Sequence, residues 1–380
     1  MSKVTNVPRI RFKGFTNAWE QKEINEIFEV TRGKVLSEKL IVKKKNKEMK
    51  YPVYSSQTKN NGLMGYYNKF LFDTAITWTT DGANAGTVSY RQGKFYSTNV
   101  NGVLLSSKGY CNLAIACSLN KIAWKYVSKV GNPKLMNNVM KKIKIIIPIN
   151  LTEQRKLSLV LQEINDLLAL QERKLKLYKQ LKKYLLQKMF ANEQEKVPQI
   201  RFKRFDEDWR NLIFKSLCTR ITKLSNEDNL FKVEYENIKN NTVGNIKKNV
   251  EAKTGILFDK NDILYGKLRP YLRKIVKSDF KGIAVGDFWV LRPKKNSSTF
   301  IFYLIQNNKY QRAANISTGT KMPRADWDLI SNMNFKVPSL DEQHDIGQFI
   351  SLIDNIKKEQ YVSTEKTKVI KQYLLQNLFC

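Results

Sequence analysis

The chain has 380 residues, of which 42% are hydrophobic, and this is enough for two or three domains with buried cores. Sixty-seven Lys and Arg against 34 Asp and Glu give a formal net charge of +33. An AT-rich genome would explain some of the lysine but not the shortage of acids. Because such a charge repels itself unless a polyanion is near, we expect nucleic acid as the leading partner and a membrane surface as the second.

Several classes of protein are disfavoured by the composition. No stretch reaches the roughly 18 apolar residues of a membrane-spanning helix, and the opening "MSKVTNVPRIRF" contains no apolar run typical of a signal peptide. The four cysteines form no C-x-x-C pair and the chain has one His, so neither a disulfide framework nor a zinc site is expected. We expect a cytoplasmic chain with free thiols and no membrane partner.

The same phrase opens each half of the chain. "VPRIRFKGFTNAW" runs from Val7 to Trp19, and "VPQIRFKRFDEDW" runs from Val197 to Trp209. The two are separated by half the length of the chain, which we call the repeat interval. Two further pairs follow at this interval or one residue less: "IPINLTEQRKL" with "VPSLDEQHDI", and "KKYLLQKMF" with "IKQYLLQNLF". Three anchors in one order indicate a tandem duplication, with a period too long for a solenoid. A Trp that recurs at a domain start is typical of core packing, so we interpret the phrase as structural.

The first front, residues 1–150, is expected to consist of short strands and loops. "FLFDTAITWTTDG" and "FYSTNVNGVLLSS" cluster strand-forming residues between turn residues. The loops "YSSQTKNNG" and "TWTTDGANAG" carry hydroxyls and amides that can reach base edges, although an ordinary polar loop is the alternative for any single residue. They supply the DNA-binding candidates Tyr54, Ser55, Ser56, Thr58, Lys59, Trp78, Thr79, Thr80 and Asn84.

A long helix is predicted over residues 151–191. Alternating steps of four and three from Leu157 predict ten seam positions, and apolar residues occupy all of them except Gln171 and Lys182. No Gly or Pro interrupts the run. This pattern indicates a coiled-coil seam on a helix roughly 60 Å long. Thr152 with Glu153 is expected to cap its start.

The second front, residues 192–338, has the same kind of pattern with different loops. "GILFDKNDILYGKLRPYLRKIV" and "GIAVGDFWVLRP" predict strands that align loosely with those of the first front. Arg is suited to guanine edges and phosphates, and Tyr to sugars and phosphates. The stretches "YGKLRPYLRK" and "STGTKMPR" therefore supply the DNA-binding candidates Tyr265, Lys267, Arg269, Tyr271, Arg273, Lys274, Thr320, Lys321 and Arg324.

The second long helix, over residues 339–380, has a weaker seam, with a polar centre in "KKEQYVSTEKTK". A helix of this length with one apolar stripe needs a partner, and its duplicate is the nearest candidate. We predict an α+β fold: two globular mixed α/β fronts and two long helices paired as an antiparallel coiled coil, in a pseudo-two-fold tandem repeat. The alternative is two separate helices that each pack on their own front.

Motifs for catalysis are scarce. The sequence contains no G-x-x-x-x-G-K-[ST] and no H-E-x-x-H, and the single His344 cannot build a His-based triad or metal site. The triplets "EMK" and "EAK" resemble nuclease motifs, but chance produces such triplets in a Lys-rich chain. The Asn/Asp-Pro-Pro-aromatic tetrapeptide of amino-methyltransferases is missing. We expect no catalytic residue and no metal ligand on this chain.

The repeated frame resembles the specificity subunit of a type I restriction–modification enzyme. The similarity is carried by the two opening phrases, by "IPINLTEQRKLSLVLQEIN" with "VPSLDEQHDIGQFISLID", and by the endings "YLLQKMF" and "YLLQNLF". "NDILYGKLRPYLRK" also resembles a recurrent phrase of the family's recognition domains. The first copy departs from the pattern by one extra residue before Glu153.

This resemblance implies a DNA-binding function in host defence. Residues 1–150 and 192–338 would be target-recognition domains, each reading one half of a bipartite, asymmetric site in double-stranded DNA, with residues 151–191 and 339–380 as spacer helices. Two methyltransferase subunits and two restriction subunits, which are motor-nucleases, would dock on the chain. S-adenosylmethionine, ATP and Mg would be bound by those partners and not by this chain.

Two other functions compete with this interpretation. A freestanding bipartite DNA-binding regulator would need no partner surface beyond its own helices. A fused nuclease would be an enzyme active on DNA with a divalent metal. A methyltransferase gene beside this one would favour the specificity subunit.

Overall fold

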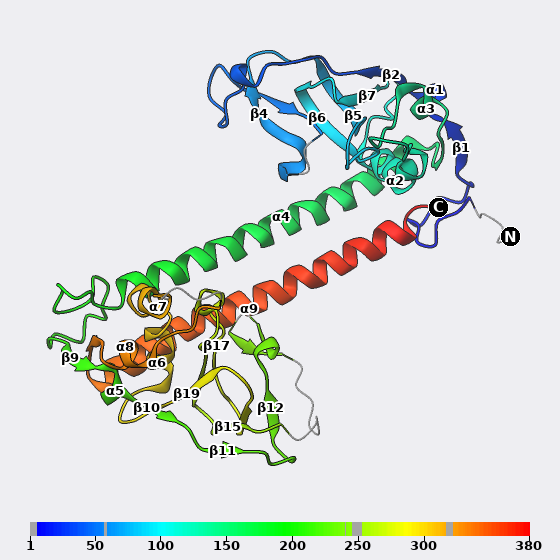
Figure 1. The fold of residues 1–380 in the computed structure, drawn as a ribbon. Helices are drawn as coiled ribbons and strands as arrows, with labels where there is room; N and C mark the ends of the chain where they lie inside the picture. The colour runs from blue at the N-terminus through cyan, green and yellow to red at the C-terminus, as the bar shows by residue number, and fades with distance from the viewer. Residues whose placement is uncertain (1–5, 57–58, 240, 245–252, 317–321) are drawn as a thin grey trace. The chain divides into compact units, whose positions relative to one another are not determined.

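The computed structural model describes residues 6–56, 59–239, 241–244, 253–316 and 322–380 (Figure 1). The chain divides into two compact units. Unit 1 comprises the residues up to Glu172 together with Ser363–Cys380, and unit 2 comprises Arg173–Val362. Each unit therefore contains one front and one half of each long helix. Within the described ranges, no helix has both the length and the apolar character to cross a membrane.

Unit 1 is built on a six-stranded sheet with the order β2-β7-β5-β6-β3-β4. All neighbours are antiparallel except β3 and β6, which are parallel. Helix α2 packs on β6, and the core of this front includes Ile76 of β5, Leu104 of β7 and Ile115 of α2. The elements of this front are β1 Glu20–Glu23, α1 Ile24–Ile27, β2 Glu29–Arg32, η1 Glu38–Leu40, β3 Tyr51–Tyr54, η2 Lys59–Gly62, β4 Leu63–Tyr67, β5 Phe72–Thr79, β6 Val88–Ser97, β7 Asn101–Leu105, α2 Leu113–Ala123, η3 Trp124–Tyr126, α3 Asn137–Lys141 and β8 Lys144–Ile147.

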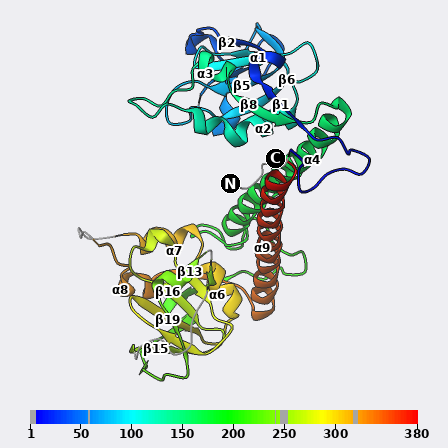
Figure 2. The ribbon, with the colours of Figure 1, turned by 90° about the vertical axis from the view of Figure 1, so that its right-hand side faces the viewer.

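Unit 2 contains two four-stranded sheets, ordered β10-β19-β16-β17 and β11-β15-β18-β12. Helix α6 packs on β17 and β19. In Figure 2 it lies beside the strands labelled β16 and β19. The elements of this front are β9 Arg210–Ile213, α5 Phe214–Leu217, β10 Cys218–Ile221, β11 Leu224–Ser225, β12 Phe231–Val233, η4 Tyr235–Asn237, β13 Ile238–Lys239, β14 Thr242–Val243, β15 Gly255–Phe258, β16 Ile263–Gly266, η5 Pro270–Leu272, β17 Ile275–Lys277, β18 Gly282–Ala284, β19 Phe288–Pro293, α6 Ser298–Leu304, α7 Asn308–Ala314, α8 Trp327–Ser331 and β20 Asn334–Val337.

The duplication extends through both fronts. The ladder β1–β8 pairs Glu20 with Ile147, and the ladder β9–β20 pairs Arg210 with Val337, so each partner is displaced by the repeat interval. Helices α3 and α8 are separated by the same interval. The strands predicted in both fronts are confirmed in β5, β7, β15, β16, β17, β18 and β19. The duplication is therefore kept in these framing elements, whereas the main sheets between them differ in the number and order of their strands.

The opening phrase of each copy binds the start of a long helix through a buried carboxylate. In unit 1, Glu153 accepts hydrogen bonds from Arg11 Nε at 2.7 Å, Arg11 Nη2 at 2.9 Å and Trp19 Nε1 at 3.2 Å. The carboxylate raises the pKa of the Arg11 guanidinium through these hydrogen bonds. Because the Glu153 residue is only 1% exposed, its charge depends on these donors for compensation.

Unit 2 repeats this arrangement. Glu342 accepts from Arg201 Nε and Nη2, both at 2.8 Å, and from Trp209 Nε1 at 3.2 Å. We call the Arg–Glu–Trp arrangement of each unit its clamp: Arg11, Glu153 and Trp19 in unit 1, and Arg201, Glu342 and Trp209 in unit 2. The opening phrase is therefore structural, as predicted. Its Arg and its Trp both bind the buried carboxylate of the long helix.

The Gln that follows each clamp carboxylate is buried as well. Gln154 donates to the carbonyl of Pro148 at 2.6 Å and accepts from Asn112 at 2.7 Å. Gln343 donates to the carbonyl of Pro338 at 3.1 Å and accepts from the backbone of Ser297 at 3.0 Å. Asn112 and Ser297 are the N-caps of α2 and α6. The Glu-Gln pair thus joins each long helix to its opening phrase and to the front's main helix.

The long helices are α4, Leu151–Lys188, and α9, Leu340–Asn377, within three residues of the predicted ends. The predicted cap at Thr152 and Glu153 is wrong. Asn150 Oδ1 accepts from the Thr152 backbone N–H at 2.8 Å, and Ser339 Oγ accepts from that of Glu342 at 3.4 Å, so the caps precede the helices. Glu153 is engaged in the clamp instead.

Within each unit the two helix halves pair antiparallel, as predicted. In unit 1, Leu157 and Leu161 share a core with Leu374 and Leu378. In unit 2, the shared core is formed by Leu185 and Met189 of the α4 segment with Ile346, Ile350 and Ile353. In both cores, higher residue numbers on one helix meet lower numbers on the other. The alternative of two separate helices is therefore wrong.

The two polar positions of the α4 seam have polar partners on α9. Gln171 is 8% exposed and donates to Ser363 Oγ at 3.1 Å in unit 1. Lys182 binds Asp354 at 2.6 Å in unit 2. Thr364 and Thr367 are also buried, so the polar stretch predicted in the second helix is packed and not merely exposed. Polar contacts of this kind specify register at a cost in stability.

The clamp predicts a large loss of stability on truncation. Glu342→Ala leaves the Arg201 charge and the Trp209 N–H without their buried acceptor, so we expect the unfolding free energy of unit 2 to fall by about 3 kcal/mol. The control Asp208→Asn removes the exposed pair Lys196–Asp208, whose side chains are 81% and 61% exposed, and should cost less than about 1 kcal/mol. Urea unfolding followed by circular dichroism measures both, and equal costs would contradict the clamp's role.

Candidate nucleic-acid interface

A common backbone frame presents the candidate loops in the two units. In unit 2, the Lys267 N–H donates to the Asp287 carbonyl at 2.9 Å, and the Lys267 carbonyl accepts from the Ala325 N–H at 2.8 Å. The Arg269 N–H donates to the Pro323 carbonyl at 2.8 Å. Residues 267–274 and 322–325 are therefore held side by side, which brings together two clusters that the sequence singled out separately.

The same three hydrogen bonds recur in unit 1. Thr80 donates to Val100 at 3.0 Å and accepts from Leu135 at 2.8 Å, and Gly82 donates to Pro133 at 2.9 Å, all through backbone atoms. Residues 131–135 were not among the site residues predicted from the sequence. The signal was present, because Pro133 and Pro323 are separated by the repeat interval, like Pro148 and Pro338.

The loop of unit 2 projects its charges through an uncommon backbone conformation. Arg269 and Arg273 have φ of 47° and 50°, and they flank the short 3₁₀ turn η5. Left-handed φ costs a non-glycine residue roughly 1–3 kcal/mol and persists where the surroundings impose it. Arg269, Tyr271, Leu272 and Arg273 are exposed, while Pro270 is buried beneath them. The loop thus offers two cations and an aromatic ring to solvent.

The other described cations of these two loops are partly neutralised. Asp287 binds Lys267 at 3.5 Å and Arg324 at 3.2 Å. Lys274 Nζ donates to the Ile238 carbonyl at 2.6 Å and lies 5.3 Å from the ring centroid of Tyr235. These three side chains are held in place by the frame, which leaves Arg269 and Arg273 as its exposed cations without a described ion pair.

In unit 1, polar side chains converge around a buried arginine. The Arg91 guanidinium carbon lies 3.9 Å from the Tyr54 ring centroid, and the side chain donates to Thr77 Oγ1 at 3.2 Å and to the Asn61 carbonyl at 2.8 Å. Burial lowers the pKa of Arg91. Arg91 was not predicted from the sequence, because its place in the middle of β6 gives no sign of its contacts with Tyr54 and Asn61.

The neighbouring candidates of unit 1 are half-buried and hydrogen-bonded. Ser55 Oγ accepts from Thr98 Oγ1 at 3.0 Å, and Asn84 Nδ2 donates to the Ser56 carbonyl at 3.5 Å. Lys59 begins η2, in which Asn60 and Asn61 both adopt left-handed backbone conformations. The two predicted loops of this unit therefore lie together, as those of unit 2 do.

Four of the DNA-binding candidates have buried side chains and are therefore not available at the surface. Trp78 is 1% exposed and donates its indole N–H to the Leu135 carbonyl at 3.0 Å. Tyr265 is 1% exposed and stacks on Trp289 at 5.5 Å between ring centroids. Thr79 and Thr80 are 7% and 4% exposed. All four lie at or just after the strand ends that build the frame. At these places the position along the strand, and not the residue type, decides whether a side chain is buried. Thr58, Thr320 and Lys321 lie outside the described residues.

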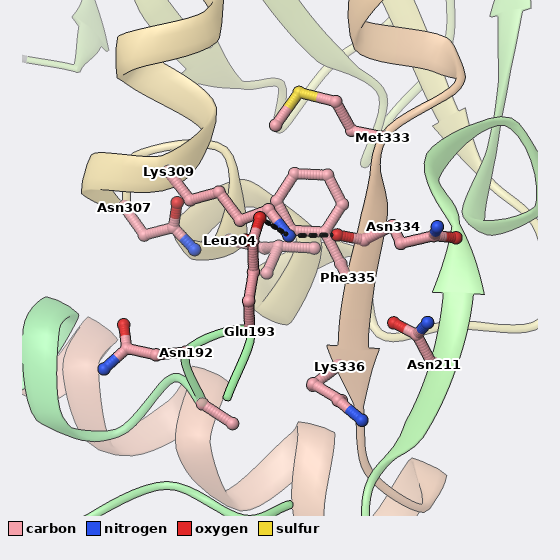
Figure 3. Close-up of a pocket in the computed structure, with 11 residues that line it drawn as sticks. Asn192, Glu193, Asn211, Leu304, Asn307, Lys309, Met333, Asn334, Phe335 and Lys336 are labelled. Atoms are coloured by element: carbon pink, nitrogen blue, oxygen red, sulfur yellow. Dashed lines mark hydrogen bonds and ion pairs between the residues drawn. The ribbon is translucent and has the colours of Figure 1, made fainter. Parts of the chain in front are cut away.

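A small polar cavity of about 400 Å³ occurs elsewhere in unit 2 (Figure 3). Lys309 points into it and binds Glu193 at 2.9 Å, above the ring of Phe335. This contact holds the segment after α4 against the front. Among the described residues, no group of three or more His, Cys, Asp or Glu is arranged to hold a metal ion.

The duplicated frame matches a known family twice. The family model of the type I restriction modification DNA specificity domain matches residues 17–202 and residues 207–366, and the two matches start one repeat interval apart. The chain belongs to this family. The resemblance seen in the opening phrases and helix starts is thereby confirmed, and the chain carries two tandem copies of this DNA specificity domain.

Relatives of this specificity subunit share sequence along different parts of it. It is 22% identical over 390 residues to the type I restriction enzyme MjaVIII specificity subunit of Methanocaldococcus jannaschii, covering 92% of this chain and 90% of the relative. The type I restriction enzyme MpnII specificity subunit of Mycoplasma pneumoniae is 35% identical over 133 residues, 34% of this chain and 39% of the relative. Other M. pneumoniae relatives are 35–39% identical, and the matches span only 44–66% of their length.

Solved structures share the fold at low identity. The crystal structure of a type I restriction-modification system S subunit from M. genitalium matches with a TM-score of 0.69 and 16% identity, over 98% of this chain and 99% of that one. A chain from a structure on complex assembly and conformational transition of the type I R-M system matches with a TM-score of 0.53 and 11% identity, over 94% and 96%.

The exposed loop of unit 2 generates a prediction for Arg269. If its side chain is bidentate to a guanine, Arg269→Ala should cost about 1–3 kcal/mol and relax selectivity only at the bases that unit 2 contacts. If it meets a phosphate, affinity should fall equally on all sequences and the salt slope should drop by about one. Titration of duplexes altered at single positions distinguishes the two.

The matched control for this prediction is Lys281→Ala, which removes an exposed cation of unit 2 outside the two loops. We expect binding like that of the wild type. Unchanged binding in Arg269→Ala would remove the loop from the interface.

Proposed function

We propose that this specificity subunit reads a bipartite, asymmetric site in double-stranded DNA, with each unit reading one half. The observation that carries the proposal is the frame with two sets of loops. The same three backbone hydrogen bonds hold residues 80–82 in unit 1 and residues 267–269 in unit 2. One scaffold that presents different side chains is what two different half-sites require.

The side chains of the two loop sets suit different groups on DNA. Unit 1 offers hydroxyls and amides, such as those of Ser55, Ser56 and Asn84, which suit several base edges. Unit 2 offers Arg269 and Arg273, which suit guanine edges and phosphates. The net charge of +33 supports the electrostatic part of the binding. As a protein that acts on chromosomal and invading DNA, the chain would work in the cytoplasm.

The long helices also carry an exposed apolar surface that repeats with the duplication. Leu181 and Tyr184 of α4 are 39% and 48% exposed in unit 2, and Ile370 and Tyr373 of α9 are 53% and 56% exposed in unit 1. The two pairs have the same separation as the matching ends of the two long helices, one residue short of the repeat interval. We call these pairs the outer stripes. Exposed apolar surface on a helix that already has its own seam is typical of a docking site.

The proposal assigns one methyltransferase subunit to each outer stripe, because equal surfaces fit two copies of one partner. Restriction subunits would then join the complex through the methyltransferases or the chain itself. S-adenosylmethionine, ATP and Mg would be held by those subunits, and this chain would contribute recognition. A freestanding regulator would leave both outer stripes uncovered, so we favour the multisubunit complex.

Exchange of one front tests the recognition function. We expect that replacing residues 20–150 with those of a related subunit, while Arg11 and Trp19 remain to bind Glu153, changes one half of the methylated motif only. The reciprocal exchange of residues 210–338 should change the other half. Methylome sequencing of cells that express each chimaera with its methyltransferase is the measurement. A change in both halves from one exchange would refute the assignment of one unit to one half.

The outer stripes generate a prediction about stoichiometry. A charge in an apolar contact is costly, so Leu181→Glu or Ile370→Glu should each leave one methyltransferase bound, and the double variant should bind none. Native mass spectrometry of the co-expressed complex counts the copies. Leu181→Met, which keeps the apolar volume, is the control and should keep both copies. Two copies on the double variant would show that docking occurs elsewhere.

A further inference from the structure

A basic groove lies in unit 2 beside residues 267–274, which we call the recognition loop. Its volume is about 1290 Å³, and its walls come from the parts of α4 and α9 that belong to this unit, from α6 and α7, and from β17. Six lysines and two arginines line it against a single carboxylate, Asp354. Asn, Gln and Thr side chains supply further polar groups along its walls.

The one carboxylate is already neutralised. Asp354 accepts from Lys182 Nζ at 2.6 Å and from the Tyr303 hydroxyl at 3.1 Å, and it also binds Lys357. Burial disfavours its ionised form, but the two lysines outweigh this effect and lower the pKa of Asp354. The carboxylate therefore stays charged and is paired with Lys182 and Lys357. No other acid lines the groove to compensate the remaining cations.

Five lining cations have no carboxylate partner among the described residues: Lys179, Lys183, Arg273, Arg312 and Lys358. They come from four separate elements, so the chain gathers them only on folding. Like charges brought together in this way destabilise the folded state unless an anion of matching size binds. The groove is far too large for a single small ion to neutralise it.

Arg273 joins this groove to the recognition loop. It is exposed at the end of η5, next to Arg269 and Tyr271, and its side chain also lines the groove. A ligand that meets the loop can therefore continue along the groove without a break in positive charge. Duplex DNA, with one negative charge per about 1.7 Å of helix axis, is such a ligand.

We propose that this groove binds the phosphodiester backbone of duplex DNA beside the half-site read by unit 2, without regard to base sequence. The proposal rests on the proposed function for the position of the half-site, but its chemistry is separate. Lysines bind phosphate as point charges, and amide and hydroxyl groups donate to phosphate oxygens. The groove would add affinity and set the DNA path, while the loops select sequence.

The test measures the salt dependence of binding in the full chain, co-expressed with its methyltransferase. The probe is a duplex of arbitrary sequence, titrated at several salt concentrations. The double variant Lys183→Gln/Lys358→Gln removes two exposed groove cations, so the slope of log K against log salt should fall by about two. Lys295→Gln removes an exposed cation of the same unit outside the groove and should leave the slope unchanged.

Two results would overturn the proposal. One is a double variant whose slope equals that of the wild type. The other is a double variant that no longer assembles with the methyltransferase while Lys295→Gln does, because the groove would then bind protein. Selectivity, measured on the same samples with a duplex carrying the methylated motif, should survive in the double variant. A wild-type complex without selectivity would refute the proposed function and leave the slope test of the groove intact.

Discussion

The buried carboxylate at the start of each long helix is the contact on which the rest of the structure depends. Glu153 and Glu342 are each 1% exposed and each accept three hydrogen bonds from an Arg and a Trp of the opening phrase. Removing a charged partner from such a site leaves a buried charge uncompensated, which is far more costly than losing a surface pair. The clamp therefore fixes where each helix begins relative to its front, and the adjacent Gln carries that alignment to α2 or α6.

Each unit is closed where an opening phrase meets the C-terminal end of a long helix. In unit 1, the backbone N–H of Ile10 donates to the Asn377 carbonyl, and Trp19 meets Phe379 at 6.2 Å between ring centroids. In unit 2, the N–H of Ile200 donates to the Lys188 carbonyl, and Trp209 meets Phe300 at 6.2 Å. The C-terminal end of α9 thus contacts the opening phrase of unit 1, and the C-terminal end of α4 contacts that of unit 2. The apolar seams lie near these ends, whereas Gln171, Thr364 and Thr367 are polar.

Much of this architecture follows from periodicity in the sequence. The repeat at half the chain length, the heptad seam of α4 and the strand-forming clusters depend on local pattern, and the structure confirms them. The clamp arginines were not predicted, because Arg11 and Arg201 look like ordinary surface cations in a Lys- and Arg-rich chain. Their carboxylate partners lie far along the sequence, at Glu153 and Glu342. Long-range pairing of single residues leaves no periodic signal.

In the candidate interface, too, some features could be predicted from the sequence and others could not. The exposed pair Arg269 and Arg273 could be predicted from residue type, because Arg in a turn next to Pro seldom enters a core. Trp78 and Tyr265 could not be assigned from type alone, since an aromatic residue at a strand end suits a core and a binding surface equally. Only the backbone frame, with Leu135 accepting the Trp78 indole and Trp289 stacked on Tyr265, decides between the two.

The central claim is that each unit is a cooperative structure made from one front and half of each long helix. Hydrogen–deuterium exchange of Glu153→Ala against the wild type tests it most directly, because exchange reports local unfolding segment by segment. We predict faster exchange in unit 1, including residues 363–380 at the other end of the chain, and unchanged exchange in residues 173–362. Loss of protection confined to residues before 172, or spread through residues 173–362, would contradict the account.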